Sequence, residues 1–258
     1  MASRAFDEQA AARLGLGCAL VTGASSGIGR ELACQLADAG VRVVALARDE
    51  QRLAEVASHN SLIVPLVADL GDPLGLAALA AMVIELGPEL DCVIHNAGVQ
   101  YNLRFDDASY DARQIRHEVD VNLVAPMVLT QSLLAHFRLR NRAWVVNVSS
   151  GLAFAPKRSA AVYSATKAGL HLFTQALRLQ CAGGDGSNVV IVEVVLPLVD
   201  TPMTAGRGRG KLSAAVAARE LLNGLAAGRR DIFIGKARAL PWLQRWAPAL
   251  LARLMRSG

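Results

Sequence analysis

Short runs of consecutive apolar residues alternate along the chain with longer stretches in which apolar residues recur at helical spacing. The runs predict strands at residues 19–22, 42–47, 62–67, 92–95, 143–148, 189–196 and 231–234. The helical patterns lie at about 27–39, 50–58, 73–86, 110–140, 161–181 and 213–227. Strands that are apolar throughout are typical of a parallel sheet covered on both faces. The alternation therefore predicts one doubly wound α/β domain over residues 1–258, with about seven strands and helices on both faces.

Composition agrees with a compact domain. Hydrophobic residues make up 53% of the 258 residues and charged residues 19%, which disfavours disorder. No apolar run approaches the roughly 18–20 residues of a membrane span, and the N-terminus lacks the apolar segment of a secretion signal. The four cysteines form no C-x-x-C pair, and the five histidines show no metal-ligand spacing. We expect a cytoplasmic protein without a metal.

The net charge of +5 is concentrated in two places. Residues 235–258 contain five cations and no acid, and residues 206–211 alternate glycine with Arg207, Arg209 and Lys211. No zinc-finger or other nucleic-acid motif accompanies either cluster, so we expect no nucleic-acid partner.

A glycine-rich turn follows the first strand. Residues 22–29 read Thr-Gly-Ala-Ser-Ser-Gly-Ile-Gly and open a helix. Glycine permits a sharp turn that brings backbone N–H groups to a pyrophosphate at the positive helix end, and the serine hydroxyls can add donors. Between a strand and a helix this turn predicts dinucleotide binding on a Rossmann fold. The expected contacts are Gly23, Ser25, Ser26, Gly27, Ile28 and Gly29.

The residues after the second and third strands bear on cofactor choice. A site for NAD usually has an acid after the second strand, whereas here Ala47 is followed by Arg48, a cation suited to the 2′-phosphate of NADP. Asp49 could be the displaced acid, but we favour it as a helix cap. Arg30 is either a second cation for the phosphate or a solvated side chain. Asp69, next to Leu70, can accept a hydrogen bond from adenine or serve as a turn residue.

Two features indicate chemistry at the other end of the cofactor. Tyr163 and Lys167 are four residues apart and share one helix face. A neighbouring ammonium lowers the pKa of a phenol and makes it a better acid–base catalyst, although a surface pair would have the same spacing. Ser150 ends a buried strand thirteen residues before Tyr163. Its hydroxyl can stabilise charge on a substrate oxygen, and the spacing favours it over Ser149.

These motifs together resemble the short-chain dehydrogenase/reductase family over nearly the full chain. The resemblance rests on residues 22–29, Asp69, residues 96–98, Asn122, Ser150, Tyr163 and Lys167, which occur in the family's order. It implies that Tyr163 is the general acid/base, that Lys167 modulates its pKa and anchors the ribose, and that Ser150 orients the substrate. It also implies that Asn122 holds a water that links Lys167 to a proton relay. Asn96, Ala97 and Gly98 would close the floor of the cofactor site.

One segment departs from the family pattern. The family has Pro-Gly after the sixth strand, followed by a threonine that touches the nicotinamide amide. Leu196-Pro197 occupies the Pro-Gly position when the chain is aligned on Thr201. Proline removes a donor and fixes φ, so the wall of the site is expected to differ here. Thr201 is carried over as the cofactor contact.

The region beyond Thr201 is expected to meet the substrate. Residues 200–228 predict a substrate loop or lid, whose cations could meet an anionic substrate, although a plain solvated loop fits equally. Residues 236–258 predict a basic amphipathic tail of two short helices. Its pattern permits contact with a membrane surface, but docking on the body or on a second subunit is favoured. These features resemble a bacterial subgroup named for D-alanine esterification of teichoic acids.

The resulting hypothesis is an NADP(H)-dependent oxidoreductase that transfers a hydride between nicotinamide and a ketone, aldehyde or secondary alcohol. Its partner is then a small carbonyl or alcohol substrate, and we expect a homo-oligomer. A non-catalytic protein that binds or senses NADP(H) is the main alternative. A sugar-nucleotide epimerase is disfavoured because the chain leaves no room for a second domain.

Overall fold

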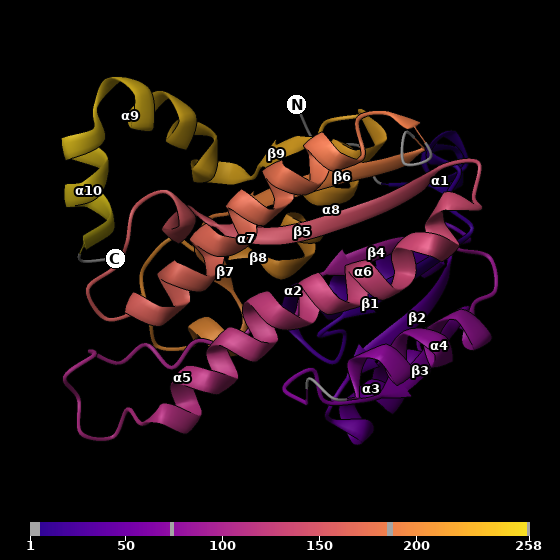
Figure 1. Ribbon diagram of the computed structural model, residues 1–258, viewed down its shortest axis with the longest axis horizontal. Helices are drawn as coiled ribbons and strands as arrows, with labels where there is room; N and C mark the ends of the chain where they lie inside the picture. Colours follow the sequence, from indigo (N-terminus) through magenta and orange to yellow (C-terminus); the bar gives the residue numbers. More distant parts are fainter. Residues whose placement is uncertain (1–5, 73–74, 185–187, 257–258) are drawn as a thin grey trace.

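A seven-stranded parallel sheet forms the centre of the computed structural model, which describes residues 6–72, 75–184 and 188–256 (Figure 1). The strand order is β3-β2-β1-β4-β5-β6-β9. The strands are β1 (Cys18–Thr22), β2 (Arg42–Ala47), β3 (Ile63–Val67), β4 (Leu90–His95), β5 (Ala143–Ser150), β6 (Val189–Leu196) and β9 (Asp231–Phe233). The predicted doubly wound fold is confirmed. The order reverses between β1 and β4, and ligands of such sheets bind at the carboxyl ends of the strands near that point.

Helices cover both faces of the sheet. Those that follow the predicted pattern are α2 (Gly27–Asp38), α3 (Glu50–Ala57), α4 (Leu76–Leu86), α5 (Ala112–Val119), α6 (Ala125–Arg138), α7 (Ala161–Gln180) and α8 (Ala214–Ala226). The first part of the predicted third helix, residues 73–74, lies outside the described residues. The α2, α3 and α8 helices pack in one apolar cluster with the sheet, and α4, α6 and α7 pack in a second cluster. Figure 1 shows α6 and α7 crossing the sheet on the same side.

The helix expected at 110–140 is interrupted by a π-helical turn, η1 (Asp120–Val124). Pro126 follows in the first turn of α6. Proline has no N–H, so it cannot donate to the carbonyl of Asn122 four residues earlier, and the α-helical ladder has to shift. The widened turn carries Asn122, which is completely buried. The sequence contained this signal in Pro126, but the periodicity alone did not indicate it.

One α-helix and two short strands of the described structure were not expected from the sequence. An N-terminal helix, α1 (Glu8–Leu14), is capped by Asp7 and packs against α8. Two very short strands, β7 (Val199–Asp200) and β8 (Leu212–Ser213), pair in parallel and close the base of the loop between them. Both strands are only two residues long, too short for a periodic pattern to reveal them.

The predicted lid segment, residues 200–228, divides into two structural parts. Residues 214–226 form α8, whose Leu221, Leu222 and Leu225 are buried in the core. A helix packed in this way against α2 is a fixed part of the fold. We therefore restrict the predicted lid to residues 201–211, which lie between β7 and β8.

The C-terminal tail forms α9 (Leu240–Trp246) and α10 (Pro248–Arg256), two short helices as expected. Leu240 and Leu251 are buried in an apolar cluster with Ala155 and Val195, so the tail docks on the body of the domain. Trp242 and Trp246 are exposed on the outside of these helices. Figure 1 shows α9 and α10 at one corner of the molecule, beyond the carboxyl ends of the strands. Within the described ranges, no helix is both long and apolar enough to cross a membrane.

Candidate active site

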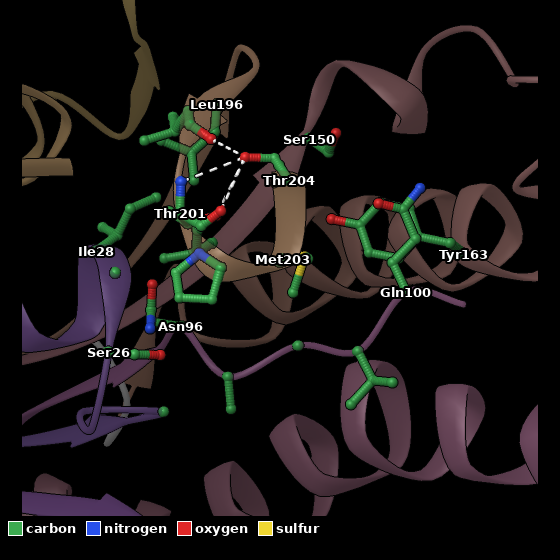
Figure 2. A pocket seen from close by; sticks show the side chains of 18 of the residues that line it. Ser26, Ile28, Asn96, Gln100, Ser150, Tyr163, Leu196, Thr201, Met203 and Thr204 are labelled. Atoms are coloured by element: carbon green, nitrogen blue, oxygen red, sulfur yellow. Dashed lines mark hydrogen bonds between the residues drawn. The ribbon is translucent and has the colours of Figure 1, made fainter. Parts of the chain in front are cut away.

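A large cavity lies at the carboxyl edge of the sheet. It encloses about 900 Å³ and extends from the glycine-rich turn after β1 to the C-terminal tail. Figure 2 shows Ser26, Ile28 and Asn96 on one side and Ser150 and Tyr163 on the other, with the segment around Thr201 between them. Every residue predicted for the site lines this cavity except Gly29 and Asn122, which support its wall from behind.

The glycine-rich turn is shaped for close approach of the backbone. A Cβ on Gly29 would lie 2.2 Å from the carbonyl oxygen of Gly23, so only glycine fits there without a shift. Gly23 itself has φ +68°, in the left-handed region. Ser26 precedes the first turn of α2, and its side chain makes no capping hydrogen bond to that helix. The residues of the turn from Ser25 to Ile28 line the cavity at the start of α2, where the first backbone N–H groups of a helix have no acceptor within it.

The segment after β4 is tied to the end of β1 by hydrogen bonds. The backbone N–H groups of Asn96 and Ala97 both donate to the Thr22 hydroxyl at 3.0 Å. The Asn96 side chain donates to the Thr22 carbonyl at 3.0 Å. These contacts hold residues 96–98 across the switch point, where they form the cavity floor that the family resemblance implied.

Cations and acids alternate at the ends of β2 and β3. Arg48 lies 3.8 Å from Asp69 and 3.3 Å from the imidazole of His117. Asp49 caps α3 by accepting from the backbone N–H of Arg52, whose guanidinium lies 3.2 Å from the same carboxylate. The structure thus shows Asp49 in the capping position that the sequence favoured. Arg52 is a cavity-lining cation one helical turn after Arg48, and sequence reasoning missed it.

Of the other residues considered for the adenine and the 2′-phosphate, two line the cavity and one does not. Asp69 accepts from the backbone N–H of Gly71 at 2.8 Å with one oxygen, and its other oxygen faces Arg48. Leu70 lies beside it in the cavity wall. Arg30 is exposed and outside the cavity lining, so the structure favours the solvated alternative for it.

Tyr163 and Ser150 meet at the opposite end. Tyr163 is in the first turn of α7 and Ser150 is the last residue of β5. The Ser150 hydroxyl accepts from the Leu152 N–H at 3.2 Å and also lowers the pKa of Tyr163 by hydrogen bonding. Ser149, its rival in the sequence, is buried.

The pKa of Tyr163 is raised, in contrast to the lowering expected from a neighbouring ammonium. Burial raises the pKa of Tyr163 to about 12, and the opposing effects come from Ser150 and the charge of Arg207. The Lys167 ammonium lies 5.7 Å from the centre of the phenol ring and donates to the Val148 carbonyl at 2.8 Å. The Lys167 ammonium is thus held at the end of β5. Loss of hydration is the largest effect on the pKa of the Tyr163 phenol.

Lys167 is itself strongly affected by burial. Loss of hydration lowers its pKa to about 8, and the charge of Glu193 acts in the opposite direction. Glu193 is buried in β6 and binds His171 at 2.7 Å. An ammonium with a pKa near 8 is mostly charged at neutral pH.

Asn122 serves as a clamp on the cavity floor. Its side-chain carbonyl accepts from the Val99 N–H at 2.8 Å, and its amide donates to the Val99 carbonyl at 2.8 Å. The amide also lies 3.3 Å from the Thr166 hydroxyl. These contacts use both polar groups of the Asn122 side chain and leave its backbone carbonyl outside them. Pro126 leaves that carbonyl without its usual α-helical donor.

Thr201 lies opposite the glycine-rich turn. A Cβ on Gly27 would lie 3.0 Å from the Thr201 Cγ2, so the two segments are in contact. The backbone N–H of Thr201 donates to the Thr204 hydroxyl at 3.2 Å, one of the bonds drawn in Figure 2. Pro197, at the family's usual glycine position, is part of the cavity wall. The departure from the family pattern therefore borders the cavity, as expected.

The part of the cavity beyond Tyr163 contains residues that the sequence did not assign. They come from four segments and comprise Gln100, Leu152, Lys157, Met203, Arg207, Lys236, Leu240 and Met255. Of these, Met203 and Arg207 belong to the lid loop that was expected near the substrate. No local signal marks Gln100, Lys236 or Met255, because only the tertiary fold brings them to the site.

Comparison with known proteins agrees with the fold and this geometry. The family model described as short chain dehydrogenase matches residues 17–211. The oxidoreductase DltE of Bacillus subtilis is 33% identical over 220 residues, covering 83% of this chain and 86% of that protein. A short-chain dehydrogenase from Burkholderia cenocepacia, solved with NADP, has 26% identity and a TM-score of 0.81, covering 93% of this chain and 98% of that one.

A third comparison concerns an enzyme with a stated substrate preference. The bulky-bulky ketone specific alcohol dehydrogenase from Comamonas testosteroni has 26% identity and a TM-score of 0.76. The alignment covers 92% of this chain and 94% of that one.

The doubly wound sheet, the glycine-rich turn and the tyrosine–lysine pair define a nicotinamide-dependent oxidoreductase of the Rossmann class. The chain belongs to the short-chain dehydrogenase family. The predicted resemblance to the subgroup named for teichoic acid D-alanylation is confirmed by the similarity to DltE.

Proposed function

We propose that this protein is an NADP(H)-dependent reductase of ketones or aldehydes, which also oxidises secondary alcohols in reverse. The observation that carries the proposal is the meeting of Tyr163, Ser150 and Lys167 in one cavity with the glycine-rich turn. A raised pKa keeps the Tyr163 phenol protonated at neutral pH, which is the form that a reductase needs in its proton donor.

The residues present fit the cofactor. The Gly23–Gly29 turn leaves room for a pyrophosphate against backbone N–H groups, since a Cβ at either end would collide with neighbouring backbone. Arg48 and Arg52 would hold the 2′-phosphate of NADP, and Asp69 and Leu70 the adenine. Asn96, Ala97, Gly98 and Thr201 would surround the nicotinamide side. The NADP bound by the Burkholderia structure supports the same choice.

The chain's own residues would act on the substrate as follows. Bound NADPH supplies the hydride. Ser150 donates a hydrogen bond to the carbonyl oxygen and fixes its direction, and Tyr163 donates the proton that this oxygen takes up. Lys167 holds the ribose, and its ammonium favours the phenolate that remains. Asn122 keeps residues 96–99 in place and would offer its backbone carbonyl to a relay water.

A ketone is the favoured substrate among carbonyl compounds. The cavity is large and partly apolar beyond Tyr163, where Leu152, Met203 and Leu240 line it. The similarity to a ketone-specific alcohol dehydrogenase supports the same class. A cytoplasmic location and a homo-oligomer remain predictions from the sequence.

Substitution of Tyr163 by phenylalanine tests the mechanism and the non-catalytic alternative together. We expect Tyr163→Phe to lower kcat for ketone reduction by about 10²- to 10⁴-fold, because the proton donor is removed. NADPH oxidation is followed by absorbance with a panel of aliphatic and aryl ketones. Tyr101→Phe removes a phenol outside the cavity lining and should keep wild-type activity.

Two results would contradict the proposal. If Tyr163→Phe retained full activity, the assigned proton donor would be wrong. If the wild-type protein bound NADPH tightly but reduced none of the ketones or aldehydes in the panel, the binding or sensing alternative would be preferred.

A further inference from the structure

Three cations collect at the end of the cavity that the mechanism leaves for the body of the substrate. Lys157, Arg207 and Lys236 line this part, which we name the basic end. Lys157 and Arg207 are half-buried, and Lys236 is exposed. They come from the segment before α7, from the lid loop and from the turn after β9, so the tertiary fold alone assembles them.

Neutral groups are the partners of the two half-buried cations. Arg207 donates to the side-chain carbonyl of Gln100 at 2.9 Å, and Lys157 donates to that of Asn102 at 3.2 Å. Burial lowers the pKa of Lys157, and the charge of Arg207 lowers it further. Burial raises the pKa of Tyr163, and the charge of Arg207 opposes that rise, so Arg207 is within electrostatic reach of both groups. A half-buried cation beside a second cation is unfavourable unless an anion joins them.

Acidic side chains lie elsewhere. Asp49 and Asp69 are the acids among the described residues that line the cavity, and both belong to the ends of β2 and β3. Glu118 is the acid whose charge reaches Tyr163. Its two oxygens are held by the Tyr101 N–H and the Tyr110 hydroxyl, and it does not line the cavity.

The other two cations of the lid loop behave differently. Lys211 pairs with Asp200 at 3.2 Å and donates to the Thr204 carbonyl at 2.7 Å. Arg209 is exposed and lies outside the cavity lining. The loop is therefore more than a uniformly basic solvated segment, because one cation of the three enters the cavity.

We propose that the basic end binds a carboxylate of the substrate while the substrate carbonyl lies at Ser150 and Tyr163. This inference rests on the proposed function and names its substrate class as ketones that carry an acid group. The planar guanidinium of Arg207 offers N–H donors beyond the one that contacts Gln100, and such a fork matches a carboxylate. Leu152, Leu240 and Met255 line the same region, so an aliphatic chain suits the part between the two groups.

Matched pairs of keto acids and their methyl esters test the proposal. The probes are 4-oxopentanoate, 5-oxohexanoate and 6-oxoheptanoate, each compared with its ester at fixed ionic strength and saturating NADPH. For at least one chain length, we expect kcat/KM of the acid to exceed that of the ester about tenfold or more, because the ester lacks the charge. The difference should lie mainly in KM.

Variants of the basic end sharpen this test. Arg207→Gln and Lys157→Gln should each lower the acid-to-ester ratio about tenfold, toward a ratio of one, because each removes a charged hydrogen-bond partner. Using the ratio removes any general effect of Arg207 on the Tyr163 pKa. Arg209→Gln, two residues away in the same loop, is the matched control and should keep the ratio within about twofold.

The outcomes separate the two proposals. Equal kcat/KM for every acid and its ester, or an equal loss in Arg209→Gln and Arg207→Gln, would overturn the basic end and leave the reductase proposal standing. If no acid or ester were reduced, the reductase proposal would depend on the panel of other ketones and aldehydes. Titration of the NADP⁺-bound protein with hexanoate, which has no ketone, would then decide: weaker binding in Arg207→Gln than in Arg209→Gln supports the basic end, and equal binding overturns it.

Discussion

The two ends of the cavity hold their cations in different ways. At the end formed by β2 and β3, Arg48 faces Asp69 and Arg52 faces Asp49, so each cation has an acid beside it. At the basic end, Lys157 and Arg207 contact the neutral side chains of Asn102 and Gln100. The first arrangement is close to electrically balanced, and the second attracts an anion.

The two ends also differ in how far apart their residues are in sequence. Arg48, Asp49 and Arg52 lie within one strand end and the helix turn that follows it. Lys157, Arg207 and Lys236 are separated by about 30 to 50 residues each, and Met255 of the tail joins them. Cofactor binding therefore depends on turns whose residues are close together in sequence. Substrate recognition depends on loops that are far apart in sequence and come together in the fold. Four measurements test this difference between the two ends.

The largest expected effect is at the glycine-rich turn. Gly29→Ala places a Cβ 2.2 Å from the Gly23 carbonyl oxygen and 2.6 Å from the Asn96 amide. Because both neighbours form the cradle, we expect the Kd for NADPH to rise more than about 100-fold, through loss of several backbone contacts. Fluorescence titration measures the binding. Gly183→Ala, where a Cβ has open space, is the control, and wild-type affinity in Gly29→Ala would show that the phosphates lie elsewhere.

The next effect concerns the 2′-phosphate. The double variant Arg48→Gln/Arg52→Gln should raise KM for NADPH about 100-fold and change KM for NADH much less, because each lost contact to the phosphate is charge-assisted. Steady-state assays with both cofactors give the ratio. Arg30→Gln, at the exposed arginine outside the lining, should leave it unchanged. A wild-type enzyme that used NADH as well as NADPH would refute the role of Arg48.

The pH profile tests the reacting groups between the two ends. Burial lowers the pKa of Lys167 to about 8, so this ammonium loses its charge as the pH rises through that value. We expect kcat/KM for ketone reduction to be level below about pH 7.5 and to fall toward tenfold per unit well above pH 8. Alcohol oxidation should instead rise with pH, because the Tyr163 phenolate is needed and its pKa is raised.

Lys167→Arg supplies the control for this profile. An arginine stays charged at every accessible pH, so the fall in ketone reduction near pH 8 should disappear if the variant folds and binds NADPH. A break that stayed at the same pH would assign the titration to another group.

The smallest effect is expected at the tail. Leu251→Ala removes a buried side chain that joins α10 to the body. We expect unfolding to become easier by about 2 kcal/mol, the lower end of the usual range, because the site lies near the surface. KM for the ketone should rise about threefold while KM for NADPH stays the same, since α10 borders only the basic end. Leu254→Ala, at an exposed position of the same helix, is the control. A matching rise in both KM values would contradict the separation of the two ends.

The sheet, the order of its elements and most of the cofactor end of the cavity could be predicted from the amino-acid sequence alone. Apolar strands, the glycines at 23, 27 and 29 and the pair Tyr163 and Lys167 act through neighbours that are close in the chain, so their spacing carries the information. The spacing to Tyr163 favoured Ser150 over Ser149; both serines line the cavity, and Ser149 is the more buried of the two. The capping role of Asp49 could also be predicted, because a helix cap depends only on the residues of the first helical turn.

The pKa values and contacts that depend on burial and on distant segments could be learned only from the folded structure. The pKa of Tyr163 is raised instead of lowered, because the free energy of hydrating a phenolate depends on everything packed around it. The two-residue strands and the entry of Arg207 into the cavity have the same origin. Each is set by contacts between parts of the chain whose distance in space cannot be deduced from their separation in sequence.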